Sequence, residues 1–290
     1  MNTTNTNGIE LKPFLLKIVS KWYYFVLAAV FALSFAYYKV KSTEPTYRYD
    51  GLLLIDDKQT GSKGAAEILN VIQRLDRKKN LINEIGVVSS LSLIRKVVDN
   101  LNFKISYYVG DESGKNEIYG EGVPILVKMD TLVPQLIDLP IYVDVISADT
   151  YRLHIDSEDK EIKQYDFTQE KIVMRSFDRY KVKKNLQFGQ RYKDKFLNFR
   201  ILKNNDLDKY IGQTLQFKIH NPDQVARKYK SNLKAEQAFK DSYIIGLSVE
   251  GKVPRKEADF LDNLMETFIE LDLNEKNREG RQALALFVTR

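Results

Sequence analysis

An uncharged run between Lys21 and Lys39 limits what this chain can fold into more than any other stretch. It extends from Trp22 to Tyr38 and is apolar on every helical face. As a helix its roughly 17 residues would be about 25 Å long, at the short end of what crosses a bilayer. We therefore predict one transmembrane helix over residues 22–38, with about 250 of the 290 residues on one side of the membrane.

Both ends of this run carry residues that anchor helices at membrane surfaces. Aromatic rings with a polar edge favour the level of the lipid headgroups, and lysine stems extend toward water from inside the bilayer. The predicted anchor residues are Trp22, Tyr23 and Tyr24 at one end, Tyr37 and Tyr38 at the other, and the flanking Lys21 and Lys39.

Two other interpretations of the run are open. A buried core helix is disfavoured, because all faces are apolar and the run is close to the N-terminus. A cleaved signal peptide would use Ser34-Phe35-Ala36 as its cleavage site, but aromatic residues continue beyond that site. The chain contains no cysteine, which excludes a lipoprotein anchor, disulfides, thiolate metal sites and cysteine nucleophiles.

The segment before the run, residues 1–21, predicts a short amphipathic lead. Apolar side chains recur at helical spacing between residues 9 and 19, with lysines among them, as in helices that lie on an anionic membrane surface. Lysine and arginine are balanced on the two sides of the run, so the positive-inside rule does not set its orientation.

The first part of the remaining chain predicts a strand followed by helices. Residues 47–56 read as a strand with a buried apolar centre at 52–55. Helical periodicity returns over 65–75 and again over 81–88. Ser90 is then a good N-cap for a helix over 91–101.

The C-terminal part predicts a helix, a strand and a second helix. Asn221 and Pro222 are typical of a helix start, and residues 243–249 form an apolar strand suited to the middle of a sheet. A last helix follows Pro254. Its apolar stripe consists of Ala258, Leu261, Leu264, Met265, Phe268 and Leu271.

Between residues 103 and 219 short β-rich segments alternate with turn residues. Strands are expected over 103–109, 123–129, 141–146, 151–155, 171–174, 180–182, 196–202 and 214–219. The fold class is therefore α+β: an N-terminal transmembrane helix, a mixed-sheet domain over 40–277 with an antiparallel β insert at 103–219, and a C-terminal helix.

Charge is unevenly distributed within this insert. Residues 138–170 are rich in Asp and Glu, whereas residues 175–200 are rich in Lys and Arg. A basic stretch of this kind can meet an acidic polymer or a membrane surface, or it can be the solvated face of a strand-rich region.

Several segments in a fixed order resemble a known family. They are the lead and crossing at 9–38, the strand at 47–57, the stretch 83–98, and Asp241–Ser248 followed by Ala258–Leu264. In order and spacing the chain resembles the polysaccharide co-polymerases, the chain-length determinants of bacterial surface polysaccharides. It looks closest to the N-terminal part of capsular or exopolysaccharide tyrosine autokinases, over roughly residues 9–277.

The resemblance implies a location and partners. Residues 1–21 would be cytoplasmic, and residues 40–290 would be periplasmic or otherwise outside the inner (plasma) membrane of a bacterium. The family forms ring-like homo-oligomers beside polysaccharide polymerase and export proteins, with the polysaccharide or its lipid-linked precursor as a further partner. Nucleic acid is not an expected partner.

The chain also departs from the family pattern. Family members continue to a second crossing, and the autokinases add a P-loop kinase domain and a tyrosine-rich tail. Neither is present, and residues 278–290 read as a tail outside the family. We therefore expect a truncated product, a fragment or a diverged half, without kinase activity of its own.

No sequence pattern predicts catalysis, a cofactor or a metal. The string Gly110–Asn116 is one residue short of a P-loop and has Asn116 where Ser or Thr is required. His154 and His220 have no partner at ligand spacing. The pairs Asp56-Asp57 and Glu158-Asp159 are typical of strand ends and turns.

Function is therefore expected in surfaces. The first hypothesis is a membrane-anchored co-polymerase domain that sets the length or export of a surface polysaccharide by oligomerising beside the polymerase. The alternatives are an anchored envelope adaptor or structural protein, and an enzyme with an unrecognised site. Phe260, Ile269 and Leu273 lie off the centre of the last helix's stripe and form the candidate oligomer interface.

Overall fold

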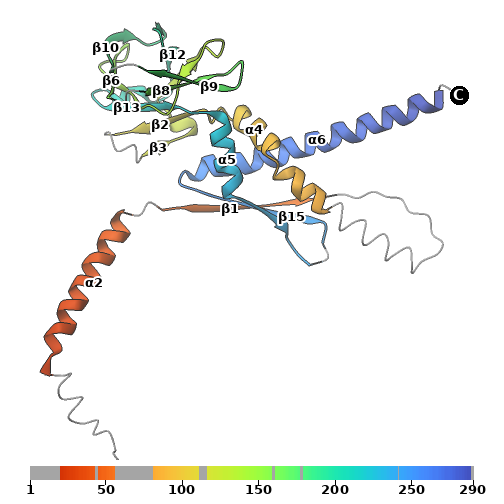
Figure 1. Cartoon of the computed structure of the whole chain (residues 1–290), viewed down its shortest axis with the longest axis horizontal. Helices are drawn as coiled ribbons and strands as arrows, with labels where there is room; N and C mark the ends of the chain where they lie inside the picture. Colours follow the sequence, from red (N-terminus) through yellow and green to blue (C-terminus); the bar gives the residue numbers. More distant parts are fainter. Residues whose placement is uncertain are drawn as a thin grey trace, which may run out of the picture. The chain divides into compact units, whose positions relative to one another are not determined.

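The computed structural model describes residues 20–42, 45–55, 81–110, 116–158, 161–176, 179–240 and 242–288 (Figure 1). The chain divides into two units, residues 1–45 and 46–290. The helix predicted over 65–75 and the pair Asp56-Asp57 lie outside the described residues.

The first unit contains helix α2, Trp22–Ser42, which begins at the predicted residue and ends beyond Tyr38. Every described side chain from residue 20 to 40 is exposed. Over Trp22–Val40 the helix is long and apolar enough to cross a membrane, and it is the one such helix among the described residues. These properties are compatible with a single membrane anchor, and a signal sequence near an N-terminus has the same ones.

The second unit is α+β, as predicted. Its helices include α4 (Leu91–Asn100), α5 (Pro222–Asn232) and α6 (Pro254–Val288), with short 3-10 turns η1 (Gly120–Gly122) and η2 (Leu207–Tyr210). Its strands are β1 (Tyr47–Leu54), β2 (Ile105–Val109), β3 (Glu117–Ile118), β4 (Ile125–Met129), β5 (Gln135–Leu136), β6 (Ile141–Val145), β7 (Thr150–Ser157), β8 (Glu161–Asp166), β9 (Lys171–Ser176), β10 (Tyr180–Gln187), β11 (Arg191–Lys193), β12 (Asn198–Lys203), β13 (Thr214–Ile219), β14 (Leu233–Gln237) and β15 (Ile244–Gly251).

All strand pairings among these elements are antiparallel, so the expectation of a mixed sheet is wrong for the part of the chain described. A small sheet has the order β1-β15-β14, with helices α4, α5 and α6 packed together beside it (Figure 1). β15 is the central strand of this sheet, as its continuous apolar run predicts.

The predicted burial of residues 52–55 in β1 is wrong. Leu53 is buried, but Leu52 and Leu54 are 62% and 70% exposed. β1 is an edge strand whose successive side chains point to opposite faces. On its covered face Gly51 lies against α6: a Cβ there would be 3.1 Å from Leu261 Cδ2 and 3.2 Å from the Met265 sulfur.

The helix starts follow local sequence rules. The Ser90 hydroxyl accepts a hydrogen bond from the Leu93 backbone N–H at 3.3 Å. The Asn221 side chain accepts one from the Asp223 backbone N–H at 2.9 Å, with Pro222 at the first helical position. Each cap satisfies a backbone donor that has no partner within its own helix. The helix predicted over 81–88 is also present.

Helix α6 is longer than its predicted stripe. It continues through residues 278–288, which the sequence predicts as a tail outside the family's helical pattern. Leu261, Leu264 and Phe268 are buried as predicted, whereas Leu271 is 42% exposed and does not belong to the core.

The β-rich part has its own core. A six-stranded sheet of order β10-β7-β6-β13-β2-β3 lies beside the three-stranded sheets β11-β12-β4 and β5-β8-β9. The buried side chains between them extend from Ile105 to Ile219. Phe199 on β12 and Phe217 on β13 meet edge to face at 5.4 Å across this core.

Arg95 links the β-rich part to the helices. Its Nε donates a hydrogen bond to Asp223 Oδ1 of α5 at 2.9 Å, and it also pairs with Asp99 of its own helix and with Glu170 at 3.7 Å. The Tyr165 hydroxyl of β8 donates to the other oxygen of Asp223 at 3.0 Å. The Arg95 side chain is only 18% exposed.

Candidate functional site

The predicted anchor residues lie on α2, except Lys21, which directly precedes it. All seven, Lys21, Trp22, Tyr23, Tyr24, Tyr37, Tyr38 and Lys39, are exposed within their unit. The Lys21 ammonium donates a hydrogen bond to the Tyr23 hydroxyl at 3.3 Å and lies 5.8 Å and 5.9 Å from the ring centroids of Tyr23 and Tyr24. One end of the helix therefore combines a cation with aromatic rings.

Of the three residues in the candidate oligomer interface, two are exposed and one is buried. Ile269 and Leu273 are 46% and 54% exposed on α6. Phe260 is 0% exposed and stacks on Tyr229 with ring centroids 4.2 Å apart. The expectation that Phe260 is open to a neighbour is wrong, because α5 supplies an aromatic partner that the spacing along α6 does not reveal.

The weak motifs do not come together as one site. Residues 111–115 of the P-loop-like string, and Asp159, lie outside the described residues. His154 stacks on Tyr142, and Glu158 pairs with Arg179 at 3.5 Å. Among the described residues, no group of three or more His, Asp or Glu side chains is placed to hold a metal ion.

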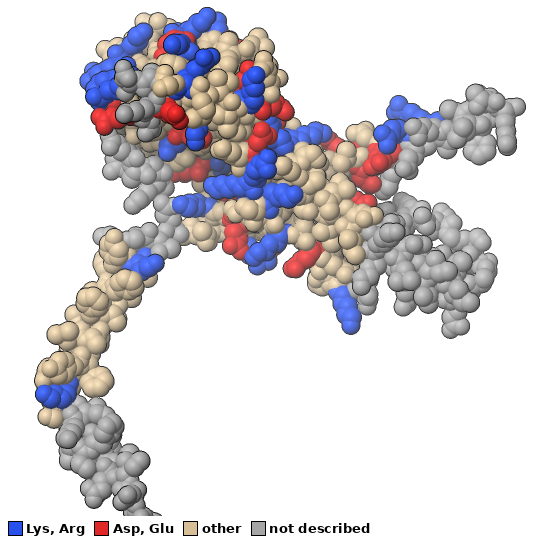
Figure 2. Space-filling model, in the orientation of Figure 1, with Lys and Arg blue, Asp and Glu red and all other residues tan. Residues whose placement is uncertain are grey.

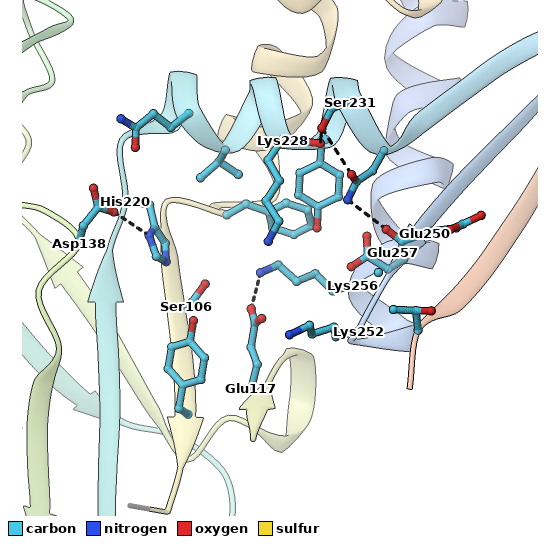
Figure 3. Close-up of a pocket in the computed structure, with 18 of the residues that line it drawn as sticks. Ser106, Glu117, Asp138, His220, Lys228, Ser231, Glu250, Lys252, Lys256 and Glu257 are labelled. Atoms are coloured by element: carbon cyan, nitrogen blue, oxygen red, sulfur yellow. Dashed lines mark hydrogen bonds and ion pairs between the residues drawn. The ribbon is translucent and has the colours of Figure 1, made fainter. Parts of the chain in front are cut away.

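A pocket of about 590 Å³ lies where the β-rich part meets the helices. Strands β2 and β3, helix α5, the end of β15 and the first turn of α6 contribute to its wall (Figure 3). Both lysines and carboxylates line it. The charged lining residues are Glu117, Asp138, Lys228, Lys234, Glu250, Lys252, Lys256 and Glu257.

Lys256 and Glu117 form the buried ion pair of this pocket. Lys256 comes from the first turn of α6 and Glu117 from β3, and Figure 3 shows the two side chains pointing toward each other. The Lys256 side chain is 11% exposed, and its ammonium lies 5.0 Å from the Phe103 ring centroid. The ion pair and the contact with the Phe103 ring together hold β3 against the start of α6.

Glu257 is held in a confined position next to this pair. It is 6% exposed. A Cβ on Gly251 would lie 1.9 Å from its Oε1, so glycine is needed for β15 to approach the carboxyl this closely. Burial raises the pKa of Glu257 above its ordinary value, while Lys256 and a hydrogen bond with Tyr229 oppose the rise.

The opposite wall contains His220 and Asp138. His220 Nδ1 lies 3.2 Å from Asp138 Oδ1, and the His220 backbone N–H donates to the Lys104 carbonyl at 2.7 Å. Asp138 has φ of 62°, a conformation that short polar side chains tolerate better than most. The pocket therefore presents cations and carboxylates together, which suits a polar ligand better than an apolar one.

Sequence reasoning did not find this pocket. Its walls come from segments that are far apart in the sequence, and no spacing rule connects Glu117 with Lys256 or Gly251 with Glu257. Lys256 and Glu257 lie in the first turn of a predicted helix. Charged residues at such positions are usually exposed, so the sequence offered no reason to expect them in a pocket wall.

Replacing Glu257 with glutamine is expected to raise the midpoint of thermal unfolding by about 2–4 °C at neutral pH. The carboxyl has a raised pKa in the folded chain, so its ionisation disfavours folding. This penalty is complete above the folded pKa and disappears as pH falls below 4.5, where folded and unfolded chains both hold the proton. The gain from Glu257→Gln should disappear over the same interval.

Thermal unfolding of the full chain in detergent between neutral pH and pH about 4 measures this effect. Glu250→Gln is the matched control, because the Glu250 side chain is 51% exposed on the neighbouring strand. A gain for Glu257→Gln that does not change with pH would contradict the role assigned to burial.

No protein-family model matches this chain, and a search of curated proteins finds no similar sequence.

Proposed function

We propose that this chain is a membrane-anchored co-polymerase domain that regulates the chain length or export of a bacterial surface polysaccharide. It is held by α2, with residues 40–290 outside the inner membrane. It acts through surfaces, as an oligomer beside the polysaccharide polymerase and export proteins. The order of segments that resembles the chain-length determinants motivates this proposal.

The observation that carries the proposal is the exposed apolar side of α6. Ile269 and Leu273, one helical turn apart, are 46% and 54% exposed on the same helix whose earlier turns supply Leu264 and Phe268 to the core. One helix thus anchors itself in the domain and presents apolar side chains beyond it. A second copy of the chain is the occupant we propose for this surface, since neighbouring copies in a ring repeat one contact.

The geometry of the small sheet supports a side-by-side assembly. β1 and α6 pack on one another through Gly51, Leu261 and Met265, so the strand that follows α2 is attached to the helix that carries the exposed side chains. A membrane anchor raises the effective concentration of such domains, which strengthens weak contacts between copies.

The test is complementation in the host that encodes the chain. Deleting the gene should shift the length distribution of the surface polysaccharide on gels, and the wild-type chain should restore it. The double variant Ile269→Glu, Leu273→Glu should fail to restore it and should lose about tenfold or more of the crosslinked oligomer in membranes, because buried unpaired carboxylates oppose association.

Leu132→Glu is the matched control. Leu132 is 79% exposed on a turn of the β-rich part, so the same apolar-to-acid change there should restore length and crosslinking. An unchanged length distribution after deletion would contradict the proposed function. Normal crosslinking of the double variant would contradict the interface.

A further inference from the structure

The six-stranded sheet of the β-rich part packs one face into the core, and its other face carries polar and aromatic side chains. On β13, Leu215, Phe217 and Ile219 point into the core. Side chains alternate along a strand, so Thr214, Gln216 and Lys218 belong to the opposite face. We call this opposite face the outer face; it carries the polar and aromatic side chains of the sheet.

One row of residues crosses this outer face from edge to edge. Strand register places Gln216 between Tyr108 and Tyr142, and His154 on the far side of Tyr142. The row ends at Glu117 on β3 and at Lys183 on β10. Because neighbouring strands are about 4.8 Å apart, the row is about 24 Å long and its two tyrosines are about 10 Å apart.

The rings in this row are partly exposed and have defined neighbours. Tyr142 and His154 stack with centroids 4.8 Å apart and planes 12° from parallel. The Lys218 ammonium lies 5.5 Å from the Tyr108 ring centroid. Rings fixed in this way form a preorganised apolar platform on an otherwise polar surface.

Gln216, at the centre of the row, is buried, and its side-chain amide is unsatisfied within the described ranges. It is 1% exposed, and neither its side-chain nitrogen nor its oxygen has a hydrogen-bond partner among the described residues. Burying an amide in this way is unfavourable unless both atoms are satisfied. A group that is both donor and acceptor, such as a hydroxyl, is suited to this side chain.

The outer face carries both signs of charge, but its carboxylates are engaged: Asp156 pairs with Arg179 and Lys181, and Glu117 pairs with Lys256. Arg152, Lys183 and Lys218 make no ion pair with any carboxylate in the part of the chain the structure describes; Arg152 instead donates to Asn185 at 3.2 Å. The carboxylate of Asp144 is engaged by the Thr214 hydroxyl at 2.8 Å and lies 3.4 Å from His154. Figure 2 shows Lys and Arg gathered over the β-rich part, near the edge where Figure 1 labels β10.

We propose that the outer face binds a glycan chain that carries carboxylate groups. The tyrosine rings pack on the apolar faces of sugar units, the amide of Gln216 pairs with hydroxyls, and the unpaired lysines and arginine bind the carboxylates. Rings along one extended row, with Lys183 at its end and Lys218 and Arg152 beside it, fit a linear polymer. This inference rests on the proposed function, since it names the class of polymer on which the chain would act.

The row also leads into the pocket described above. Tyr108 and Ser106 of β2 belong to the outer face and line that pocket together with Lys228 (Figure 3). A polymer lying along the row can therefore place its end among the pocket's lysines and carboxylates. The pocket extends the binding face from the sheet to helix α5.

Binding is measured with the full chain in nanodiscs of neutral phospholipid and fluorescently labelled oligogalacturonate. We expect saturable binding that weakens when salt is raised from about 50 mM to about 500 mM. Polyglutamate of matched charge tests whether sugar rings matter. Equal binding to polyglutamate, or no binding to oligogalacturonate, would overturn the inference.

Variants locate the site. Tyr142→Ala and Lys183→Gln should each weaken binding by about fivefold or more, and Tyr142→Phe should keep most of it because the ring remains. Lys193→Gln is the matched control, since Lys193 is exposed on β11 of another sheet. Lys183 is itself exposed, so its variant keeps the test valid if Tyr142→Ala unfolds. Unchanged affinity for Lys183→Gln would overturn the assignment.

The two proposals fail in different experiments. Absence of binding by the wild-type chain overturns the glycan face whatever the gene deletion does to polysaccharide length. Binding that is weakened in Lys183→Gln and kept in Lys193→Gln supports the glycan face even where the deletion leaves polysaccharide length unchanged, a result that contradicts only the proposed function.

Discussion

Phe260→Ala is expected to lower the free energy of unfolding by about 3–5 kcal/mol, the range found when a buried phenylalanine is truncated. The ring is 0% exposed. It stacks on Tyr229, which in turn stacks on Phe103 with centroids 5.3 Å apart. Truncation leaves a cavity where α5, α6 and the start of the β-rich part meet, and these backbones cannot close it without separating other contacts.

Urea unfolding of the full chain, followed by circular dichroism, measures the change. Ile269→Ala is the matched control on the same helix, because its side chain is 46% exposed and should change the free energy of unfolding by about 0.5 kcal/mol or less. Equal effects of the two variants would show that Phe260 is not a core residue.

Arg95→Ala should destabilise the chain by about 2 kcal/mol, below the 3–5 kcal/mol seen on breaking a fully buried ion pair. Its guanidinium is shared by Asp99, Asp223 and Glu170, and Asp223 also accepts from Tyr165. Removing the cation leaves carboxylates near one another without compensation. The side chain is 18% exposed, so water screens part of the loss.

The same urea unfolding experiment serves this variant. Arg48→Ala is the control, because Arg48 pairs with Asp50 at 2.9 Å with both side chains more than half exposed. Such surface pairs contribute about 0–1 kcal/mol. A loss for Arg95→Ala no larger than that for Arg48→Ala would mean that the cluster does not hold the helices to the β-rich part.

Features set by neighbouring residues were predictable from the sequence. Ser90 and Asn221 cap their helices with side chains that reach backbone donors two or three residues away. The apolar run at 22–38 needs no tertiary partner to be recognised. Eight strands of the β-rich part were predicted where turn residues separate β-branched and aromatic residues, whereas β3, β5, β8 and β11 were not predicted.

Features that depend on distant partners were not predictable. Leu52 and Leu54 have the composition of buried strand residues, yet only one face of β1 is covered. β14, Leu233–Gln237, has no β-branched residue and pairs only because β15 lies beside it. Phe260 differs from Ile269 through the ring of Tyr229, which periodicity along α6 cannot place.

The candidate sites show the same limit. The outer-face row uses one residue from each of several strands, so its members are scattered from Tyr108 to Gln216 in the sequence. The basic stretch at 175–200, to which Lys183 belongs, left an acidic polymer, a membrane surface and a solvated face as open interpretations. Nothing local indicated that Lys183 lies in register with His154.

The pairing of β1 with β15 affects the order in which the chain can fold during synthesis. Leu54 pairs with Ile244. At the usual 5–20 residues per second, β1 therefore waits roughly 10–40 s on the ribosome for its partner strand. The β-rich part, which has its own core, is completed within that interval. The backbone hydrogen-bonding groups of β1 thus stay open to other strands until β15 has emerged.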